Sequence, residues 1–467
     1  MLCLLNSISE KNPVLAKMLE TLENSSTFTV LVLSAWHLAM CLAAKFVEAE
    51  LEKRAMQKRN WGKCHHCGKN LQSKGFQRRE MKTLVGKVVW RRRVGRCPNK
   101  CKIGQVAPLD KELGLEAYQS TSFEVKHLAL IAAVFLPFET AALFVKQFIN
   151  INVSPASIWC WVQDFGSRSK KRLDNQLAEL ANGETPTIEP MDKKTSSLPL
   201  AIGGDGVMVP FRSQEGSPSG RARWREVKIA VLTRLENSVT RSGKKVMRLK
   251  HRRLVAVLGN IDALKPRIWL EALRQDVLNA KQVVWLSDGG RGFWRLYRER
   301  FSTIAIGVLD FYHAAQNLWK GYASWLDGRT KKARDKFKTD RHRLRHGQSN
   351  DVLADIFIAS QLEGLPDPAR KALTKLYAYL DKHRKHIDYE SFEALGLPLG
   401  SGMVESACKW LIQQRFKGVG MRWSEEGFNS LLHLRLDWVN GRFDDLFALT
   451  SPSPNSDKPK PKRKTKI

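Results

Sequence analysis

Three acidic residues, Asp205, Asp288 and Glu405, stand in short Gly-rich segments of this chain. Asp205 and Asp288 each end an apolar run typical of a buried strand, and Glu405 lies in a helix that follows a Gly-Ser-Gly turn. Carboxylates are the ligands that Mg²⁺ prefers, and two ions roughly 4 Å apart can clamp the attacking and leaving oxygens of a phosphodiester. A single Asp beside Gly is more often a turn residue. The three acids together predict a two-metal phosphoryl-transfer site.

An Asp–His pair follows the last predicted strand. Asp310 and His313 are one helical turn apart, which places both side chains on one face of a helix. One interpretation is an N-cap Asp with a surface His, and the other is a pair of accessory groups at the acidic site. In an alternative metal set, Asp310 takes the place of Asp288.

The acids require a scaffold that brings distant segments together. Apolar runs predict strands at residues 200–204, 227–233, 254–258, 283–286 and 304–309, and helices near residues 265–279, 293–299 and 314–325. Three strands followed by alternating helices and strands is the order of a ribonuclease H-like sheet, whose first and fourth strands are neighbours. Asp205 would then lie close to Asp288.

The remainder of this part of the chain has a different pattern. Residues 326–392 are helical and basic without a strand pattern, which predicts an all-helical insertion. The catalytic domain would therefore comprise residues 198–325 and 393–447. The fold class expected for the whole chain is multidomain α/β.

Four of the eight cysteines form two close pairs, Cys64 with Cys67 and Cys97 with Cys101. A CxxC followed by Gly makes a thiolate knuckle, and a second pair beyond a hairpin can complete a tetrahedral zinc site. Residues 59–108 therefore predict a zinc ribbon that binds structural Zn²⁺. His65 or His66 could compete as a ligand, and a chance grouping of free thiols is the alternative. No secretory signal is recognisable, so a reducing cytoplasm is expected.

Helical patterns flank the zinc ribbon. Residues 115–166 contain two short apolar-periodic helices and a third capped by Ser-Pro, which resembles a helix-turn-helix DNA-binding domain. Trp159 and Trp161 of the third helix could instead be core residues. Residues 167–197 are expected to be a linker. The N-terminal helical segment, residues 1–58, carries an apolar stretch that we interpret as buried or helix-pairing, with no membrane contact.

Basic residues dominate the charge: 78 Lys and Arg against 46 Asp and Glu leave a net charge of +32. This excess favours a polyanionic partner, with ribosome association or a membrane-surface role as alternatives. Arg415, Lys417 and Arg422 are expected to line a DNA path beside the acids, supported by Trp423. If they are only a solvated helix face, the basic run of residues 329–345 becomes the better candidate. Residues 451–467 form a Lys-rich tail expected to be disordered.

Several of these segments together resemble one enzyme family. The motifs surround Asp205, residues 224–228, Asp288, residues 309–314, Glu405 and residues 420–423, and the resemblance extends over residues 61–447. They resemble the DDE transposases of bacterial insertion sequences, of the ISKra family related to Mutator-like transposases. The resemblance implies Asp205, Asp288 and Glu405 as catalytic residues that bind Mg²⁺ or Mn²⁺, with Asp310 and His313 beside them.

The resemblance also implies partners. A transposase of this kind would bind double-stranded DNA, both terminal inverted repeats and target, as a homo-oligomer, and would be nucleoid-associated in the bacterial cytoplasm. It would cut element ends and transfer the strand to target DNA. The alternative is a non-catalytic repressor of the element that uses only the zinc ribbon and the helix-turn-helix-like domain.

Overall fold

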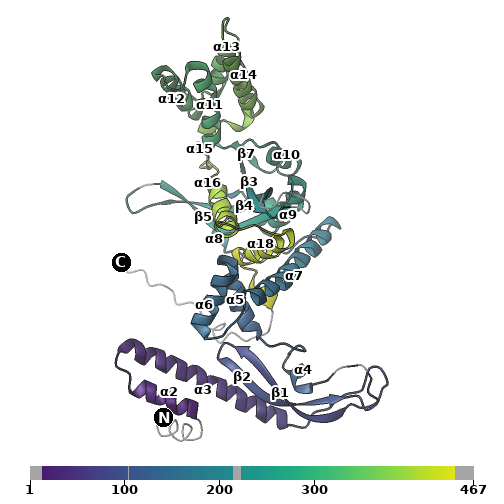
Figure 1. Ribbon diagram of the computed structural model, residues 1–467. Helices are drawn as coiled ribbons and strands as arrows, with labels where there is room; N and C mark the ends of the chain where they lie inside the picture. Colours follow the sequence, from purple (N-terminus) through teal and green to yellow (C-terminus); the bar gives the residue numbers. More distant parts are fainter. Residues whose placement is uncertain (1–12, 102, 104, 214–221, 244, 448–467) are drawn as a thin grey trace. The chain divides into compact units, whose positions relative to one another are not determined.

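The computed structural model describes residues 13–101, 103, 105–213, 222–243 and 245–447 (Figure 1). The predicted tail, residues 451–467, and the first twelve residues of the N-terminal segment lie outside these ranges. The chain divides into two compact units, Met1–Trp161 and Val162–Ile467, and the long helix α7 crosses the division. Each unit is described by itself.

The first unit begins with a pair of helices, α2 (Pro13–Glu23) and α3 (Phe28–Met56). Leu15 and Leu19 of α2 pack against Leu38 of α3, so the predicted helix pairing is present. The expectation of a buried segment is wrong for residues 28–33, all of which are exposed, Phe28 by 80%. The reason is that α2 covers α3 only around Leu38.

Helix α3 is also the one helix among the described residues whose length and composition would allow it to cross a membrane. Its most apolar 18-residue window has a mean hydropathy of 1.9, and 11% of that window is buried. The segment is therefore no core helix of this unit.

A long hairpin of β1 (Gln72–Thr83) and β2 (Gly86–Arg96) follows. Thr83 pairs with Gly86 across a turn of two residues, and Gly86 has a positive φ of +106°, which glycine adopts without strain. The hairpin predicted around this glycine is confirmed. Val88 and Trp90 of β2 are buried against the second half of α3.

Helices complete the first unit: α4 (Pro108–Glu112), α5 (Phe123–Phe135), α6 (Phe138–Ile149) and the start of α7 (Pro155–Ala181). Asn150 in a left-handed conformation ends α6, and Pro155 opens α7, as the sequence suggests. Trp159 is exposed, so it is not a core residue of this unit.

The predicted linker, residues 167–197, is wrong in its first half, because α7 continues to Ala181. Two of the polar residues in this half make tertiary hydrogen bonds. The Ser169 hydroxyl and the Arg172 guanidinium donate to the two oxygens of Asp437, at 2.5 and 2.8 Å. Asp437 belongs to α18 (Glu425–Val439). Contacts with α18 therefore stabilise a segment whose charged composition is typical of a linker. Between Ala181 and residue 197 the described chain contains one short helix, α8 (Lys193–Ser196).

The second unit is built on a mixed five-stranded sheet with the order β5-β4-β3-β6-β7. Its strands are β3 (Leu200–Phe211), β4 (Arg223–Val239), β5 (Lys245–Leu258), β6 (Val283–Ser287) and β7 (Ile306–Leu309). The first three are antiparallel, and β6 and β7 run parallel to β3. The predicted adjacency of the first and fourth strands, β3 and β6, is confirmed.

Strands β4 and β5 extend well beyond the apolar runs that predicted them, as a hairpin arm that leaves the sheet (Figure 1). Pairs such as Glu236 with Arg248 continue the ladder there. Polar residues on both faces of an exposed arm carry no alternating apolar signal, so the pattern misses them.

Helices lie between and after the strands. They are α9 (Ile261–Arg274), η1 (Val277–Asn279), α10 (Arg291–Arg300), α11 (Phe311–Leu326), α12 (Lys331–Arg345), α13 (Ser349–Ser360), α14 (Asp367–Lys382), η2 (Arg384–His386), α15 (Tyr389–Ala394), α16 (Gly402–Ala407), η3 (Cys408–Gln413), α17 (Gln414–Phe416), α18 and η4 (Asp444–Phe447). The segment of residues 326–392 is helical and contains no strand within the described chain. The fully buried Asp340 accepts a hydrogen bond from Tyr322 at 2.6 Å and is ion paired with Lys336 and Arg343, which joins α12 to α11.

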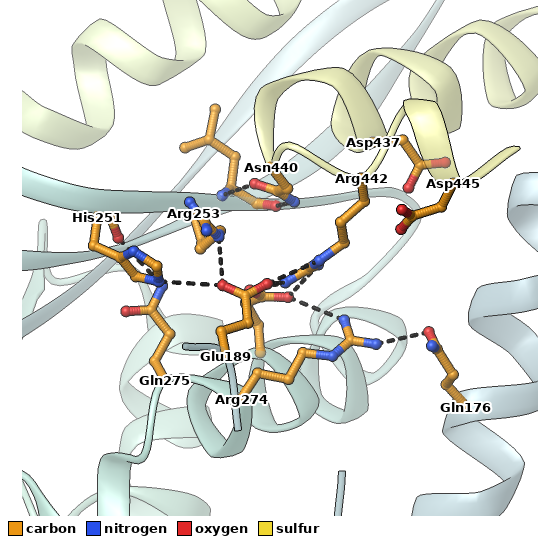
Figure 2. Close-up of polar contacts among 12 residues, drawn as sticks. Gln176, Glu189, His251, Arg253, Arg274, Gln275, Asp437, Asn440, Arg442 and Asp445 are labelled. Carbon is orange, nitrogen blue, oxygen red and sulfur yellow. Dashed lines mark hydrogen bonds and ion pairs between the residues drawn. The ribbon is translucent and has the colours of Figure 1, made fainter. Parts of the chain in front are cut away.

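An ionic network fastens the loop before α8 to the sheet and to α9 (Figure 2). Arg442 forms a two-pronged pair with Glu271, at 2.7 and 2.9 Å, and also binds Glu189. Glu189 in turn accepts from Arg253 at 2.7 Å and lies 3.2 Å from His251. Burial would raise the pKa of Glu189, but His251 and the charges of Arg442 and Arg253 outweigh it and hold that pKa at about 2.

This network predicts an acid-sensitive stability. A carboxylate whose pKa is depressed in the folded state stabilises above its unfolded pKa and loses that contribution as pH falls toward the folded value. We expect Glu189→Gln to lower the free energy of unfolding at pH 7 by about 3 kcal/mol, and by much less near pH 2. Denaturant unfolding at both pH values measures this. The exposed Glu179→Gln is the control, and an equal loss at both pH values would contradict the role of the Glu189 charge.

Candidate functional site

Asp205 and Asp288 lie on neighbouring parallel strands. Gly203 of β3 pairs with Leu286 of β6, and each acid follows its paired residue by two positions. Side chains two residues apart point to the same face of a strand, and neighbouring strands lie about 4.8 Å apart. Asp205 lies within β3 and Asp288 directly follows β6, so the two acids come at the same level of neighbouring strands, and their role in one metal site stays a prediction.

Their electrostatics match this placement. Burial raises the pKa of Asp205, and the charge of Asp288 raises it further, against a hydrogen bond from the Gly206 amide and the charge of His313. The Asp288 carboxylate accepts from the Gly290 amide at 2.9 Å. Two carboxylates that repel one another in a partly buried place gain when a cation lies between them.

Glycines let two helices approach β3. A Cβ added at Gly203 would lie 2.7 Å from a Val404 methyl group of α16, and one added at Gly204 would clash with Phe293 of α10. Because real Cβ atoms do not come this close to neighbours, larger residues would push the helices away. Gly203 therefore lets α16, which carries Glu405, pack against the strand that carries Asp205, and Gly204 does the same for α10.

Glu405 occupies the first turn of the helix that runs from Gly402 to Phe416. Its side chain is 69% exposed and forms an ion pair with Lys409 at 2.8 Å, which lowers its pKa. The nearby Cys408 thiol is buried, and burial together with the charges of Asp205 and Glu405 raises its pKa to about 12. Glu405 is thus near Asp205, but among the described residues the three acids do not form a ligand group as close as the four cysteines below.

Asp310 and His313 are joined in one arrangement. Asp310 caps α11: its Oδ1 accepts from the His313 amide at 2.8 Å and lies 3.2 Å from His313 Nδ1. Its Oδ2 accepts from both the amide and the hydroxyl of Ser401, each at 2.5 Å. Burial opposes ionisation, but these hydrogen bonds outweigh it and hold the pKa of Asp310 well below its usual range.

The N-cap interpretation of Asp310 is confirmed, and the accessory role of the pair stays a prediction. Asp310 is an N-cap, and its two oxygens are already engaged, which disfavours it as the metal ligand in place of Asp288. His313 is half-exposed, and its pKa is raised first by the hydrogen bond with Asp310 and then by the charges of Asp310, Asp288 and Asp205. Its imidazole lies within the field of the acidic site.

The helix after Glu405 contains a π-helical segment, η3, that sequence reasoning misses. Such a segment leaves backbone carbonyls without their usual partners. The buried Arg435 of α18 supplies them: its guanidinium donates to the carbonyls of Leu411 at 2.7 Å and Trp410 at 2.5 Å. An Arg between Leu434 and Leu436, in a Leu-rich segment, is the sequence signal that could have revealed it.

One predicted DNA-binding residue is placed wrongly by the sequence. Arg415 is only 2% exposed, lies 5.4 Å from the centre of the Trp423 ring, and has its pKa lowered to about 10, first by burial and then by the charge of Arg435. Its side chain is therefore part of the interior and does not line a surface. Lys417 and Arg422 are exposed as expected. Trp423 joins this turn to the end of β3, where its amide donates to the Pro210 carbonyl at 3.2 Å.

The first unit holds a second candidate site. The sulfurs of Cys64, Cys67, Cys97 and Cys101 all lie within 4.8 Å of one another, and the Cys67 and Cys97 sulfurs are 3.3 Å apart. Four thiolates bound to Zn²⁺ at about 2.3 Å would be about 3.8 Å apart, so the group has the right size for one ion. Both knuckles bend through left-handed residues, Gly68 (φ +71°) and Lys100 (φ +55°). His65 and His66 are exposed and outside the group, which leaves an all-cysteine ligand set.

Comparisons with known proteins add little. No family model matches the chain, and no curated protein matches it. A solved structure, the Drosophila P element transposase strand transfer complex, is similar to 72% of this chain and 95% of its own, with 10% identity and a TM-score of 0.33. At that TM-score the likeness assigns neither a fold family nor a function to this chain.

Zinc binding can be tested on the intact chain. We expect purified protein to contain one zinc per chain, and Cys64→Ser to lose it because three thiolates no longer close the site. Cys160→Ser, at an exposed cysteine of α7, is the matched control and should keep its zinc. Metal content by elemental analysis and limited proteolysis of residues 59–108 are the measurements. A Cys64→Ser protein with full zinc would contradict the assignment.

Proposed function

We propose that this protein is a DNA transposase of the DDE type, a metal-dependent polynucleotidyl transferase with a ribonuclease H-like core. The observation that carries the proposal is that Asp205, within β3, and Asp288, directly after β6, each follow the paired residues Gly203 and Leu286 by two positions, with the Glu405 helix packed on β3. The mixed sheet order β5-β4-β3-β6-β7 is the order expected of such a core. The insertion-sequence origin and the ISKra family assignment rest on the sequence motifs.

The residues would divide the work as follows. Asp205, Asp288 and Glu405 would hold two Mg²⁺ or Mn²⁺ ions, which supply activation of the attacking oxygen and neutralise charge on the phosphate. Glu405 must release Lys409 to join them, which its exposure allows. Asp310 fixes His313 beside the acids, where a partly charged imidazole can contact a DNA phosphate.

DNA contact would be shared between the units. In the second unit, exposed Lys417 and Arg422 lie in the turn that follows the Glu405 helix. In the first, the zinc ribbon and helices α5–α7 would bind the terminal inverted repeats. The net charge of +32 supports a polyanionic partner. We further propose action as a homo-oligomer on DNA in the bacterial cytoplasm.

Cleavage tests the acidic site. Asp288→Asn should reduce Mg²⁺-dependent nicking of a plasmid that carries the gene and its flanking DNA by about 1000-fold, while DNA binding survives. The control is Asp262→Asn, at an exposed acid of α9 paired with Arg295. If Asp288→Asn nicked the plasmid as fast as wild type, the assignment of Asp288 as a metal ligand would be wrong. Binding without any nicking by wild type would favour the non-catalytic repressor.

Salt dependence tests the revised DNA path. Replacing Lys417 and Arg422 by Ala should weaken binding to element ends and to random duplex equally, and should reduce the slope of log affinity against log salt by about 2, because two phosphate contacts are lost. Lys194→Ala with Lys371→Ala, two exposed lysines on α8 and α14, is the charge-matched control. An unchanged slope would show that these cations are only a solvated surface.

A further inference from the structure

A tyrosine of the helical segment, Tyr379 on α14, contacts the bend that directly follows β6. Its hydroxyl donates to the main-chain carbonyl of Asp288 at 3.3 Å, across a separation of 91 positions in the sequence. The Tyr379 side chain is half-buried at this contact. The bond therefore joins the segment of residues 326–392 to the part of the sheet that carries one of the three acids.

The ring of Tyr379 packs on the same bend. Gly289 has a positive φ of +88°, and a Cβ there would lie 2.7 Å from Cε2 of Tyr379. A side chain at position 289 would be strained by the backbone and would also collide with the ring. Gly289 therefore lets the tyrosine lie directly against the main chain next to Asp288.

The main chain of this bend also orients the Asp288 carboxylate. Oδ1 of Asp288 accepts from the Gly290 amide at 2.9 Å, so the carboxylate is tied to the backbone two residues further on. Tyr379 holds the carbonyl of Asp288, and Gly290 holds its side chain. A shift of the bend would therefore turn the carboxylate.

The hydroxyl of Tyr379 also connects to α11. It is hydrogen bonded to the Asn317 side chain, and Nδ2 of Asn317 donates to the His313 carbonyl at 2.9 Å. Burial, followed by the charges of Asp288 and Asp310, raises the pKa of Tyr379 well above its usual range, against the effect of Asn317. The phenol is therefore protonated at neutral pH and remains a hydrogen-bond donor to Asp288.

A second contact between the helical segment and the sheet does not involve Asp288. Nδ1 of His386, on η2, is hydrogen bonded to the Gly307 carbonyl of β7 at 3.0 Å. The imidazole also packs against Trp294 of α10, with ring centroids 4.4 Å apart. The helical segment is therefore held against the sheet at a place other than Tyr379, and the bond from Tyr379 is the one directed at the acid.

We propose that Tyr379 is a positioning residue for Asp288, which fixes the bend after β6 and thereby the direction from which the carboxylate meets a divalent cation. This role rests on the proposed function and gives the helical segment a part in selecting the metal. Mg²⁺ requires near-ideal octahedral geometry with short bonds, whereas Ca²⁺ accepts variable geometry with longer ones. A carboxylate held in one direction by Tyr379 therefore favours Mg²⁺ over Ca²⁺.

Metal binding to the full chain tests this role. The electron paramagnetic resonance signal of free Mn²⁺ follows Mn²⁺ binding, and competition with Mn²⁺ gives the affinities for Mg²⁺ and Ca²⁺. Binding at the acidic site is the part that Asp288→Asn removes. Tyr379→Phe keeps the ring against Gly289 and loses the hydroxyl, so it should weaken Mg²⁺ binding there about 5-fold and Ca²⁺ binding by less.

Two variants are matched controls. His386→Phe also keeps an aromatic ring and removes one hydrogen bond between the helical segment and the sheet, but that bond does not involve Asp288. Tyr377→Phe removes a hydroxyl from α14 at a ring that packs on Phe357 of α13. Both variants should bind Mg²⁺ and Ca²⁺ with the affinities of wild type.

Each contrary outcome has a distinct meaning. An unchanged ratio of Mg²⁺ to Ca²⁺ affinity in Tyr379→Phe would overturn the role of the hydroxyl while leaving the acids as metal ligands. An equal fall of that ratio in His386→Phe would also overturn it, because general packing of the helical segment would then explain the effect. If wild type bound no more Mn²⁺ than Asp288→Asn does, the proposed function itself would be wrong.

Discussion

The close packing of α16 on β3 is the contact on which the second unit depends. It exists because residue 203 has no side chain, so that Val404 and Met403 can rest on the backbone of the strand. Gly204 does the same for α10 on the other face of that strand. A helix is thus seated directly on each face of β3 at two successive residues. Asp205 follows them in the middle of the strand.

The elements around the acids are held by buried polar contacts more than by apolar burial alone. Arg435 completes the π-helical segment, Asp310 caps α11 while binding the loop before α16, and Arg442 joins three segments of the chain. Each such contact is costly to break, since a buried charge would be left without a partner. Two of the acids are the exception. Among the described residues neither Asp205 nor Asp288 has an ion pair, whereas Glu405 is paired with Lys409. Partly buried carboxylates without an ion pair are expected of groups that bind a ligand.

The sequence predicts those parts of the fold that local patterns encode. Apolar runs locate the five strands, glycine marks the hairpin turn at Gly86, and cysteine spacing identifies the ligand group that the structure brings together. What fails depends on contacts between distant segments. Arg415 is buried beside the ring of Trp423, and α7 extends beyond its predicted end, where Ser169 and Arg172 bind Asp437. Nothing within a short window of sequence records these partners, and the exposure of α3 at Phe28 is equally invisible there.

The 3.3 Å between the sulfurs of Cys67 and Cys97 has a consequence for handling the protein. With an ion bound, both thiolates are committed to the metal. Once a chelator removes it, two thiols remain close enough for a disulfide to form with little movement of the backbone. A disulfide between these two cysteines would then prevent the site from binding zinc again. Metal loss in air would become irreversible without a reductant, which makes the first unit sensitive to redox conditions as well as to chelation.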